Sequence, residues 1–234
     1  MNTKVQRAHS LIIAVLSMGA VVKASADATI VVDPSASWQG FMNVFEIPQN
    51  GGGYVFGSGW GTVDLTAVFS GSTLTLGPNT IGDPSTFWYI GGGAPGAIGN
   101  KTMDANLYLE TTGVYVGQTL TFSGTVLANT LVGSMDALNN GWTSVAFIKD
   151  FAPDYSSSVS STVALTPGAF SVMLATINDP ARHIQIGFET IGPDVWATDV
   201  GPFGTVVIAT VPEPSSLALL AIGSLGLLAL RRRK

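Results

Sequence analysis

Residues 120–126 read LTFSGTV and residues 184–188 read IQIGF, and these two stretches decide the fold. In each of them apolar residues alternate with small or polar ones, so every second side chain falls on the same face of an extended chain. β-Branched and aromatic residues fill the apolar positions, as is typical of strands that bury one face. The sequence therefore predicts half-buried β-strands at both places.

Similar stretches recur along the chain, separated by clusters of Gly, Pro, Asn and Asp. The predicted strands are residues 29–32, 41–47, 62–69, 72–76, 106–111, 119–127, 144–151, 161–165, 169–175, 184–189 and 205–209. Glycine-rich residues 51–53 and 57–61 lack the helix or lysine of a phosphate-binding loop and predict a hairpin loop and a bulged strand. Many short strands with regular turns predict an all-β fold, an antiparallel β-sandwich or jelly roll.

The N-terminus has the features of a signal peptide. The first ten residues are basic without an acid, residues 11–22 are almost wholly apolar, and Ala24 and Ala26 supply the small residues of an A-x-A cleavage site. The apolar run is shorter than the roughly 20 residues that cross a bilayer. We therefore predict that residues 1–26 are a signal-peptide helix, removed by signal peptidase so that the mature chain starts at Asp27.

The C-terminus combines three elements in a fixed order. A Val-Pro-Glu-Pro segment is followed by an apolar stretch, residues 215–230, and then by a basic tail. The apolar stretch predicts a transmembrane helix of about 24 Å, which suits transient insertion in the inner membrane better than a permanent anchor. The basic tail should stay cytoplasmic. The residues of the motif and the tail are Pro212, Glu213, Pro214, Arg231, Arg232, Arg233 and Lys234.

These three elements resemble the PEP-CTERM sorting signal of exported bacterial proteins, over residues 211–234. The resemblance implies recognition by an exosortase, a membrane-embedded cysteine protease-transpeptidase, and processing near the Pro-Glu-Pro. It also implies a final location at the cell surface or in the extracellular matrix, in bacteria that often make exopolysaccharide and biofilms. An ordinary tail anchor would explain the helix and the basic tail but not the Pro-Glu-Pro.

Between the two ends, residues 27–210 have the size of one domain with a substantial core. This part holds 14 acidic residues against three basic ones, a net charge of −11, whereas the whole chain has −5. Such a surface repels phosphate backbones and excludes nucleic-acid binding. The chain has no cysteine, which excludes disulfides, thiol catalysis and cysteine metal sites.

The part of the chain after Gly113 resembles the strand succession of jelly-roll carbohydrate-binding modules. The segments that carry this resemblance of pattern are residues 117–124, 145–150, 163–170, 184–188 and 204–208. The resemblance transfers no functional position. We expect residues 27–112 to supply the remaining strands of the same sandwich, with a separate small domain as the alternative.

Residues 27–210 contain no recognisable catalytic motif. His183 is their one histidine, at the start of a predicted strand, and no Gly-x-Ser-x-Gly elbow supplies a nucleophile. Glycoside hydrolysis needs two carboxylates about 5–10 Å apart, and no local motif selects a pair from Glu46, Glu110, Glu189 and the aspartates. We therefore predict a protein that is not an enzyme and has no cofactor.

Calcium is the one ion that the acidic turns could hold. Asp150 and Asp154 flank one predicted turn, and Asp194 and Asp199 lie in a second one. Oxygen-rich loops suit Ca²⁺, but the spacing of an EF-hand is absent and aspartates in turns commonly cap their own backbone. We expect backbone capping, with a Ca²⁺ site as the alternative.

Tryptophans beside Gly, Pro, Asn and Asp are the predicted ligand contacts: Trp60, Trp142 and Trp196. An exposed indole offers a flat face to a sugar ring, whereas a buried one fills the core. The leading hypothesis is a non-catalytic surface or matrix protein that binds polysaccharide. Its alternatives are a hydrolase or lyase acting on exopolysaccharide, which needs a cleft with two close carboxylates, and a self-assembling matrix component.

Overall fold

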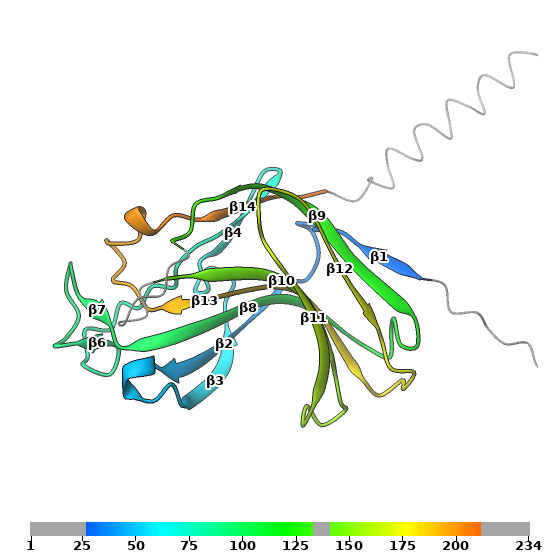
Figure 1. Cartoon of the computed structure of the whole chain (residues 1–234), viewed down its shortest axis with the longest axis horizontal. Coiled ribbons are helices and arrows are strands. Elements are labelled where there is room, and N and C mark those ends of the chain that lie inside the picture. Colours follow the sequence, from blue (N-terminus) through cyan, green and yellow to red (C-terminus); the bar gives the residue numbers. More distant parts are fainter. Residues whose placement is uncertain (1–26, 133–140, 212–234) are drawn as a thin grey trace, which may run out of the picture.

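The computed structural model describes residues 27–132 and 141–211 (Figure 1). The described chain forms two six-stranded sheets and a two-stranded hairpin, with two short 3₁₀ helices, η1 (Pro48–Asn50) and η2 (Gly201–Phe203). The predicted signal-peptide and transmembrane helices lie outside the described residues. Within the described part, none of the helices has the length and apolar character to cross a membrane.

The first sheet, sheet A, has the order β1-β9-β14-β5-β4, and β12 pairs with the other edge of β9. Its strands are β1 (Ala28–Ile30), β4 (Ala67–Ser70), β5 (Thr73–Leu76), β9 (Thr119–Asn129), β12 (Gly168–Ala175) and β14 (Val206–Ala209). All pairs are antiparallel except β1 with β9, which run parallel.

The second sheet, sheet B, is antiparallel throughout and has the order β11-β10-β13-β8-β2-β3. Its strands are β2 (Gln39–Glu46), β3 (Tyr54–Trp60), β8 (Lys101–Thr112), β10 (Thr143–Phe151), β11 (Ser158–Ala164) and β13 (His183–Pro193). The hairpin of β6 (Tyr89–Ile90) and β7 (Ile98–Gly99) stands apart. The prediction of an all-β sandwich is confirmed.

The core lies between the two sheets and is built from the stretches with the clearest alternation. Leu120 and Phe122 of β9 are fully buried, as are Ile184 and Phe188 of β13. The rings of Phe122 and Phe188 lie 5.2 Å apart, so the two sheets touch through these strands. Burying such a side chain contributes about 2–3 kcal/mol, so this contact explains why the two stretches pair across the core.

Both halves of the chain share both sheets. β1 pairs with β9 and β5 pairs with β14 in sheet A, while β2 pairs with β8 in sheet B. Strands from residues 27–112 therefore complete the sheets formed by the later residues. Local hairpins (β2–β3, β4–β5, β6–β7 and β10–β11) are thus joined into two sheets by pairs between strands far apart in the sequence.

One predicted detail needs correction. The strand predicted at residues 62–69 begins only at Ala67, because Leu65 and Thr66 donate backbone hydrogen bonds to Gly61 and Val63 in turns. The bulge expected in the glycine-rich strand lies in β3, where Val44 and Phe45 of β2 pair with Phe56 and Tyr54 and leave Val55 as the extra residue. The expected hairpin loop is present, with Gly51 at a φ of +91° that favours glycine.

Sheet B has a second face that carries polar side chains. Along β8 the core side takes Met103, Ala105 and Leu107, and the positions between them point outward. In Figure 1 the β2–β3 hairpin and the β10–β11 turn project to the same side of this sheet. The outer face of sheet B is therefore flanked on two sides, which creates the hollow described next.

Candidate functional site

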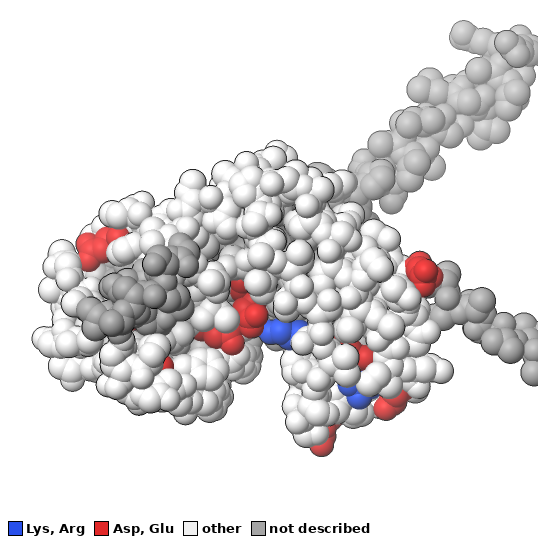
Figure 2. Space-filling model, viewed as in Figure 1, with Lys and Arg blue, Asp and Glu red and all other residues white. Residues whose placement is uncertain are grey.

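A groove of about 480 Å³ lies on the outer face of sheet B. We call it the sheet B groove, and it is lined by Phe41, Asn43, Asn106, Tyr108, Glu110, Lys149, Phe151, Tyr155 and Gln185. Figure 2 shows the molecule hollowed between the β2–β3 side and the β10–β11 side, with acidic and basic side chains at the bottom of the hollow. Aromatic and polar side chains thus meet in one concave surface.

The strand register brings these side chains together from distant parts of the sequence. Asn106 on β8 lies opposite Glu189 on β13. Four residues further along β13, Gln185 lies between Glu110 on β8 and Lys149 on β10. Since side chains two positions apart share a face of a strand, both rows lie on the floor of the groove, with the row of Tyr108 and Gly187 between them.

A hydrogen-bonded network occupies the first part of the floor. The Asp104 carboxyl accepts bonds from Asn43 Nδ2 at 3.1 Å and Asn106 Nδ2 at 2.7 Å. Lys149 Nζ donates to Asn106 Oδ1 at 2.8 Å and to Glu189 Oε1 at 3.0 Å. Every polar group of this network therefore holds at least one other member in place.

Asp104 is the perturbed acid of this network. Burial is the main cause that raises its pKa, and the neighbouring Glu189 carboxylate adds to the rise, which brings the pKa to about 7. The positive charge of Lys149 and the hydrogen bond from Asn43 oppose this shift without cancelling it. Asp104 therefore titrates near neutral pH while it contacts a second carboxyl group.

A second network holds Tyr155 at the rim. Its hydroxyl donates to Glu110 Oε1 at 2.9 Å, and Gln185 Nε2 donates to Glu110 Oε2 at 2.6 Å. The Tyr155 ring stacks on His183 with centroids 4.4 Å apart, yet the residue stays 48 % exposed. Burial and the bond to Glu110 raise the Tyr155 pKa to about 12. Its backbone is left-handed, with φ +58°, which is uncommon for an aromatic residue and typical of functional sites.

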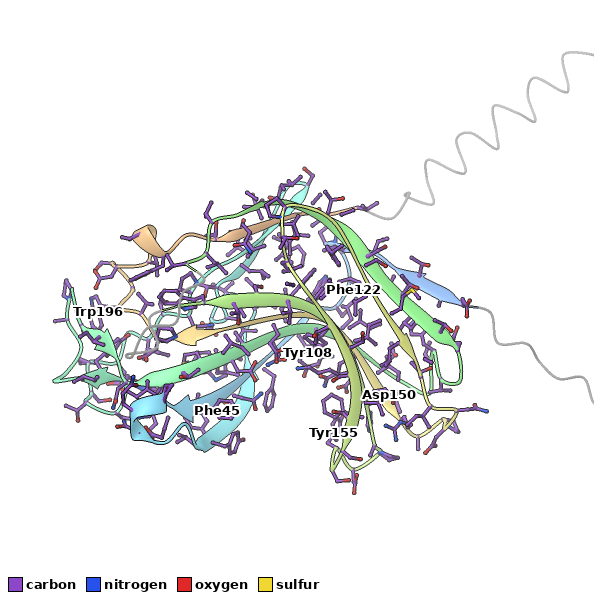
Figure 3. The ribbon with its side chains drawn as sticks, viewed as in Figure 1. Phe45, Tyr108, Phe122, Asp150, Tyr155 and Trp196 are labelled. Carbon is purple, nitrogen blue, oxygen red and sulfur yellow. The ribbon has the colours of Figure 1, made fainter. Side chains whose placement is uncertain are left out.

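On the side opposite Tyr155 the groove is lined by the Phe41 ring of β2, while Phe45 and Tyr54 of the same hairpin lie outside this lining. Phe45 packs edge-on against Tyr54 with centroids 5.5 Å apart, and Tyr54 is 62 % exposed. A side chain at Gly57 would lie 2.9 Å from both Asn43 Oδ1 and the Phe41 ring, so glycine is required for this packing. Figure 3 shows Phe45 on the β2–β3 side of the molecule and Tyr155 on the β10–β11 side, with Tyr108 between them.

The three predicted tryptophans are placed elsewhere. Trp142 is 3 % exposed, donates from Nε1 to the Pro193 carbonyl and stacks on Phe203. Trp196 is half-buried and packs edge-on against Tyr89. Trp60 is half-buried at the end of β3 and bonds Ser58 Oγ. None of the three lines the sheet B groove, so their role as ligand contacts stays a prediction.

Of the two acidic turns, the first is engaged in structural contacts. Asp150 is fully buried and accepts bonds from Arg182 Nε at 2.6 Å and from the Ile177 amide at 2.7 Å. Asp154 caps Ser156, as expected for an aspartate in a turn. Both carboxylate oxygens of Asp150 and Oδ1 of Asp154 are therefore bound by groups of the protein.

The second turn places two aspartates on one cavity of about 530 Å³. Asp194 accepts the Lys101 amide through Oδ1, and its buried Oδ2 has no partner. Burial raises the Asp194 pKa to about 7. Asp199 accepts the Gly96 amide. Across residues 27–132 and 141–211, no group of three His, Cys, Asp or Glu stands close enough to hold a metal, so Ca²⁺ at this place stays a prediction.

Sequence reasoning named Glu110 and Glu189 as candidate acids, and the structure puts both on the outer face of sheet B. It did not single out Asp104, Lys149 or Tyr155. For Asp104 and Lys149 the available signal was the outward half of an alternating strand, where charged and amide residues stand in place of Ser and Thr. Tyr155 lies in the turn between β10 and β11, where the alternation gives no signal. That signal becomes a site only when the strand order is known.

Comparison with known proteins adds one finding. A family model described as the PEP-CTERM protein-sorting motif matches residues 210–234. The chain carries a PEP-CTERM sorting motif. This motif makes exosortase the processing partner and directs export toward the cell surface. The predicted motif and cleavage residues, including Pro212 to Pro214 and Ala24 to Ala26, lie outside the described part of the structure. Neither the curated proteins nor the solved structures gave a match.

Proposed function

We propose that the exported PEP-CTERM protein binds polysaccharide in the sheet B groove and does not cleave it. The observation that carries this proposal is the pair of aromatic rings in the groove lining, the half-buried Phe41 of β2 and the exposed Tyr155 of the β10–β11 turn, with amides and carboxylates between them on the floor. Sugar rings present apolar C–H faces and polar hydroxyl edges. A site with flat rings at the sides and hydrogen-bonding groups between them complements both.

Preorganisation supports binding in particular. Tyr155 is held by its bond to Glu110 and by the ring of His183, and Gln185 fixes the same carboxylate. Side chains that are already ordered lose little entropy when a ligand arrives. The left-handed backbone of Tyr155 thus holds a ring that is both exposed and fixed in place, as a ligand-binding surface requires.

The backbone positions of the acids argue against glycoside hydrolysis, because the strand register sets neither glutamate of the floor opposite another acid. Glu110 lies four residues along β8 from Asn106, which faces Glu189, and four residues of strand span about 13 Å. Asp104 and Glu189 are instead in direct contact. The acid pairs of glycosidases lie between these two extremes, at about 5–9.5 Å.

A hydrolase or lyase is the second candidate, and the raised pKa of Asp104 is the observation that favours it. A carboxyl group that titrates near 7 can deliver a proton to a leaving group at neutral pH. The binding assay therefore needs a readout for product. Release of new reducing ends, or of unsaturated sugars absorbing in the ultraviolet, would replace the binding proposal by the catalytic one.

The test is affinity electrophoresis of the exported protein, purified as the expressing cell releases it, through gels that contain a panel of polysaccharides. We expect retardation by at least one polymer and at least a tenfold weaker retardation for Tyr155→Ala. Phe87→Ala is the matched control, because Phe87 is 40 % exposed beside the β6–β7 hairpin and does not line the groove. Equal migration in every gel, with and without Ca²⁺, would contradict the proposal.

The sorting part of the function has its own test. Replacing Pro212, Glu213 and Pro214 by alanine removes the tripeptide of the matched motif. We expect the variant to stay uncut in the inner membrane fraction of a host that has exosortase. Its unchanged release would show that processing does not depend on this tripeptide.

A further inference from the structure

We infer that the sheet B groove selects glycans without acidic groups, uncharged or amine-bearing, and rejects those with carboxylates or sulfates; the inference rests on the proposed glycan binding. It follows from the hydrogen-bond directions in the groove. An acidic glycan needs free donors or a free positive charge, whereas hydroxyl and amino groups need acceptors. The groove has committed most of its donors and left acceptor positions open.

The positive charge is already neutralised. Lys149 is the basic residue among those lining the groove. Its ammonium binds Glu189 Oε1 and Asn106 Oδ1, and it lies 4.2 Å from the centre of the Phe147 ring. An anionic ligand would have to displace the Glu189 carboxylate from this ammonium, which exchanges one ion pair for another and leaves a carboxylate unpaired.

The neutral donors are committed in the same way. Asn43 and Asn106 both donate to Asp104. Gln185 and the Tyr155 hydroxyl both donate to Glu110. Within the described residues, each of these four side chains directs one donor hydrogen at a carboxyl group of the protein, whereas the second amide hydrogens of Asn43 and Gln185 and the Tyr108 hydroxyl are not part of these bonds. A ligand carboxylate placed among them would meet few donors that are free.

The acceptors, in contrast, have capacity left. A carboxylate has about four lone-pair positions, and each oxygen of Glu110 receives one of the protein bonds described above. Three carboxyl groups, those of Asp104, Glu110 and Glu189, face one ammonium across the outer face of sheet B. Hydroxyl or ammonium groups of a sugar can donate to these positions, while a second anion is repelled by them.

The experiment compares three probes with the exported protein in the same gel or calorimetric assay: hydroxyethyl cellulose, glycol chitosan and alginate, each at low and high salt. We expect binding to at least one of the first two, and at least tenfold weaker binding to alginate. Binding to an uncharged glycan should change little with salt, whereas binding to the amine-bearing polymer should weaken as salt screens the carboxylates.

The sharpest variant is Glu110→Gln, which keeps the shape of the side chain, removes one charge and adds a donor. We expect this variant to reduce, at least threefold, the ratio by which the protein binds the non-acidic probe more tightly than alginate. Asp27→Asn is the matched control, since it removes the same charge from an exposed position outside the groove, and it should leave the preference unchanged. An equal effect of both variants would reduce the preference to net charge and overturn the inference.

The two proposals fail in different ways. Tight alginate binding that Tyr155→Ala abolishes would overturn the charge preference and keep the glycan site. Binding that no groove variant affects would overturn both, because the ligand would then bind elsewhere. Retention of the uncharged or amine-bearing probe, loss with Tyr155→Ala and gain of alginate binding with Glu110→Gln would together support the inference.

Discussion

The outer faces of the two sheets differ sharply although both sheets share one core. On sheet A the outward positions of β9 and β12 carry small or uncharged residues, among them Thr121, Ser123, Ser171 and Met173. On sheet B the corresponding positions carry the acids, amides, lysine and aromatics of the groove. The same alternation produces both faces. The period of the alternation therefore indicates the fold, whereas the types of residue at the outward positions indicate where a ligand could bind.

The largest effect should come from the core that both faces depend on. Phe188→Ala removes a ring that is 1 % exposed and touches Phe122, and we expect it to lower the free energy of unfolding by about 3–5 kcal/mol. Met173→Ala on the outer face of sheet A is the control, at 58 % exposure, and should change it by less than about 0.5 kcal/mol. Denaturant unfolding measures both, and similar losses would contradict the assignment of inner and outer faces.

A smaller effect is expected where the polar floor of sheet B is broken. Lys149→Met leaves Glu189 and Asn106 without their donor, and we expect a loss of about 1.5–3 kcal/mol. Ser171→Ala, on the outer face of sheet A, should cost less than about 0.5 kcal/mol. Adding Glu189→Gln to Lys149→Met should recover part of the loss, and a further loss in the double variant would argue against the network.

The pH dependence of stability should separate the two faces further. Asp104 faces Glu189 from β13, Lys149 from β10 and Asn43 from β2, and its pKa is raised from 3.8 to about 7. Between these two pH values the folded state keeps a proton that the unfolded state has lost. The stabilisation that Asp104 contributes to the folded state is therefore complete below pH 3.8 and disappears as the pH rises through 7.

The slope from Asp104 is at most about 1.4 kcal/mol per pH unit. Asp194, whose pKa is also raised to about 7, adds a decline of the same sign. Asp104→Asn should therefore flatten the decline in unfolding free energy between pH 4 and 7 without abolishing it. Urea unfolding across this range measures the slope, with Asp27→Asn as control. Parallel curves for the wild type and Asp104→Asn would refute the titration of Asp104.

The smallest effect is expected from charge added to sheet A. Ser171→Lys places an ammonium on its outer face, and the change in unfolding free energy should stay within about 0.5 kcal/mol. Retardation by neutral polysaccharide should change less than twofold, because sheet A contributes no residue to the groove lining. A clear gain or loss of binding would indicate that the ligand binds on sheet A and would contradict the groove on sheet B as its site.

Much of the fold could be predicted from local patterns. The alternation around Phe122 and Phe188 identified strands of the core, and glycines at positions such as Gly51 identified a turn, because both signals depend on neighbouring residues alone. The start of β4 was missed because the apolar Leu65 is buried from a turn and not from a strand. The groove was missed for a different reason, since its residues lie on strands far apart in sequence.

The sequence by itself determined the C-terminal sorting motif, the acidic and cysteine-free character, and the all-β class, and it predicts an N-terminal signal peptide. Each of these follows from composition or from the order of nearby residues. Only the tertiary structure decided that Asn43, Asp104, Lys149 and Glu189 form one network and that Phe41 and Tyr155 line the same groove. The physical reason is that backbone pairing between distant strands sets their register, and the register decides which outward side chains become neighbours.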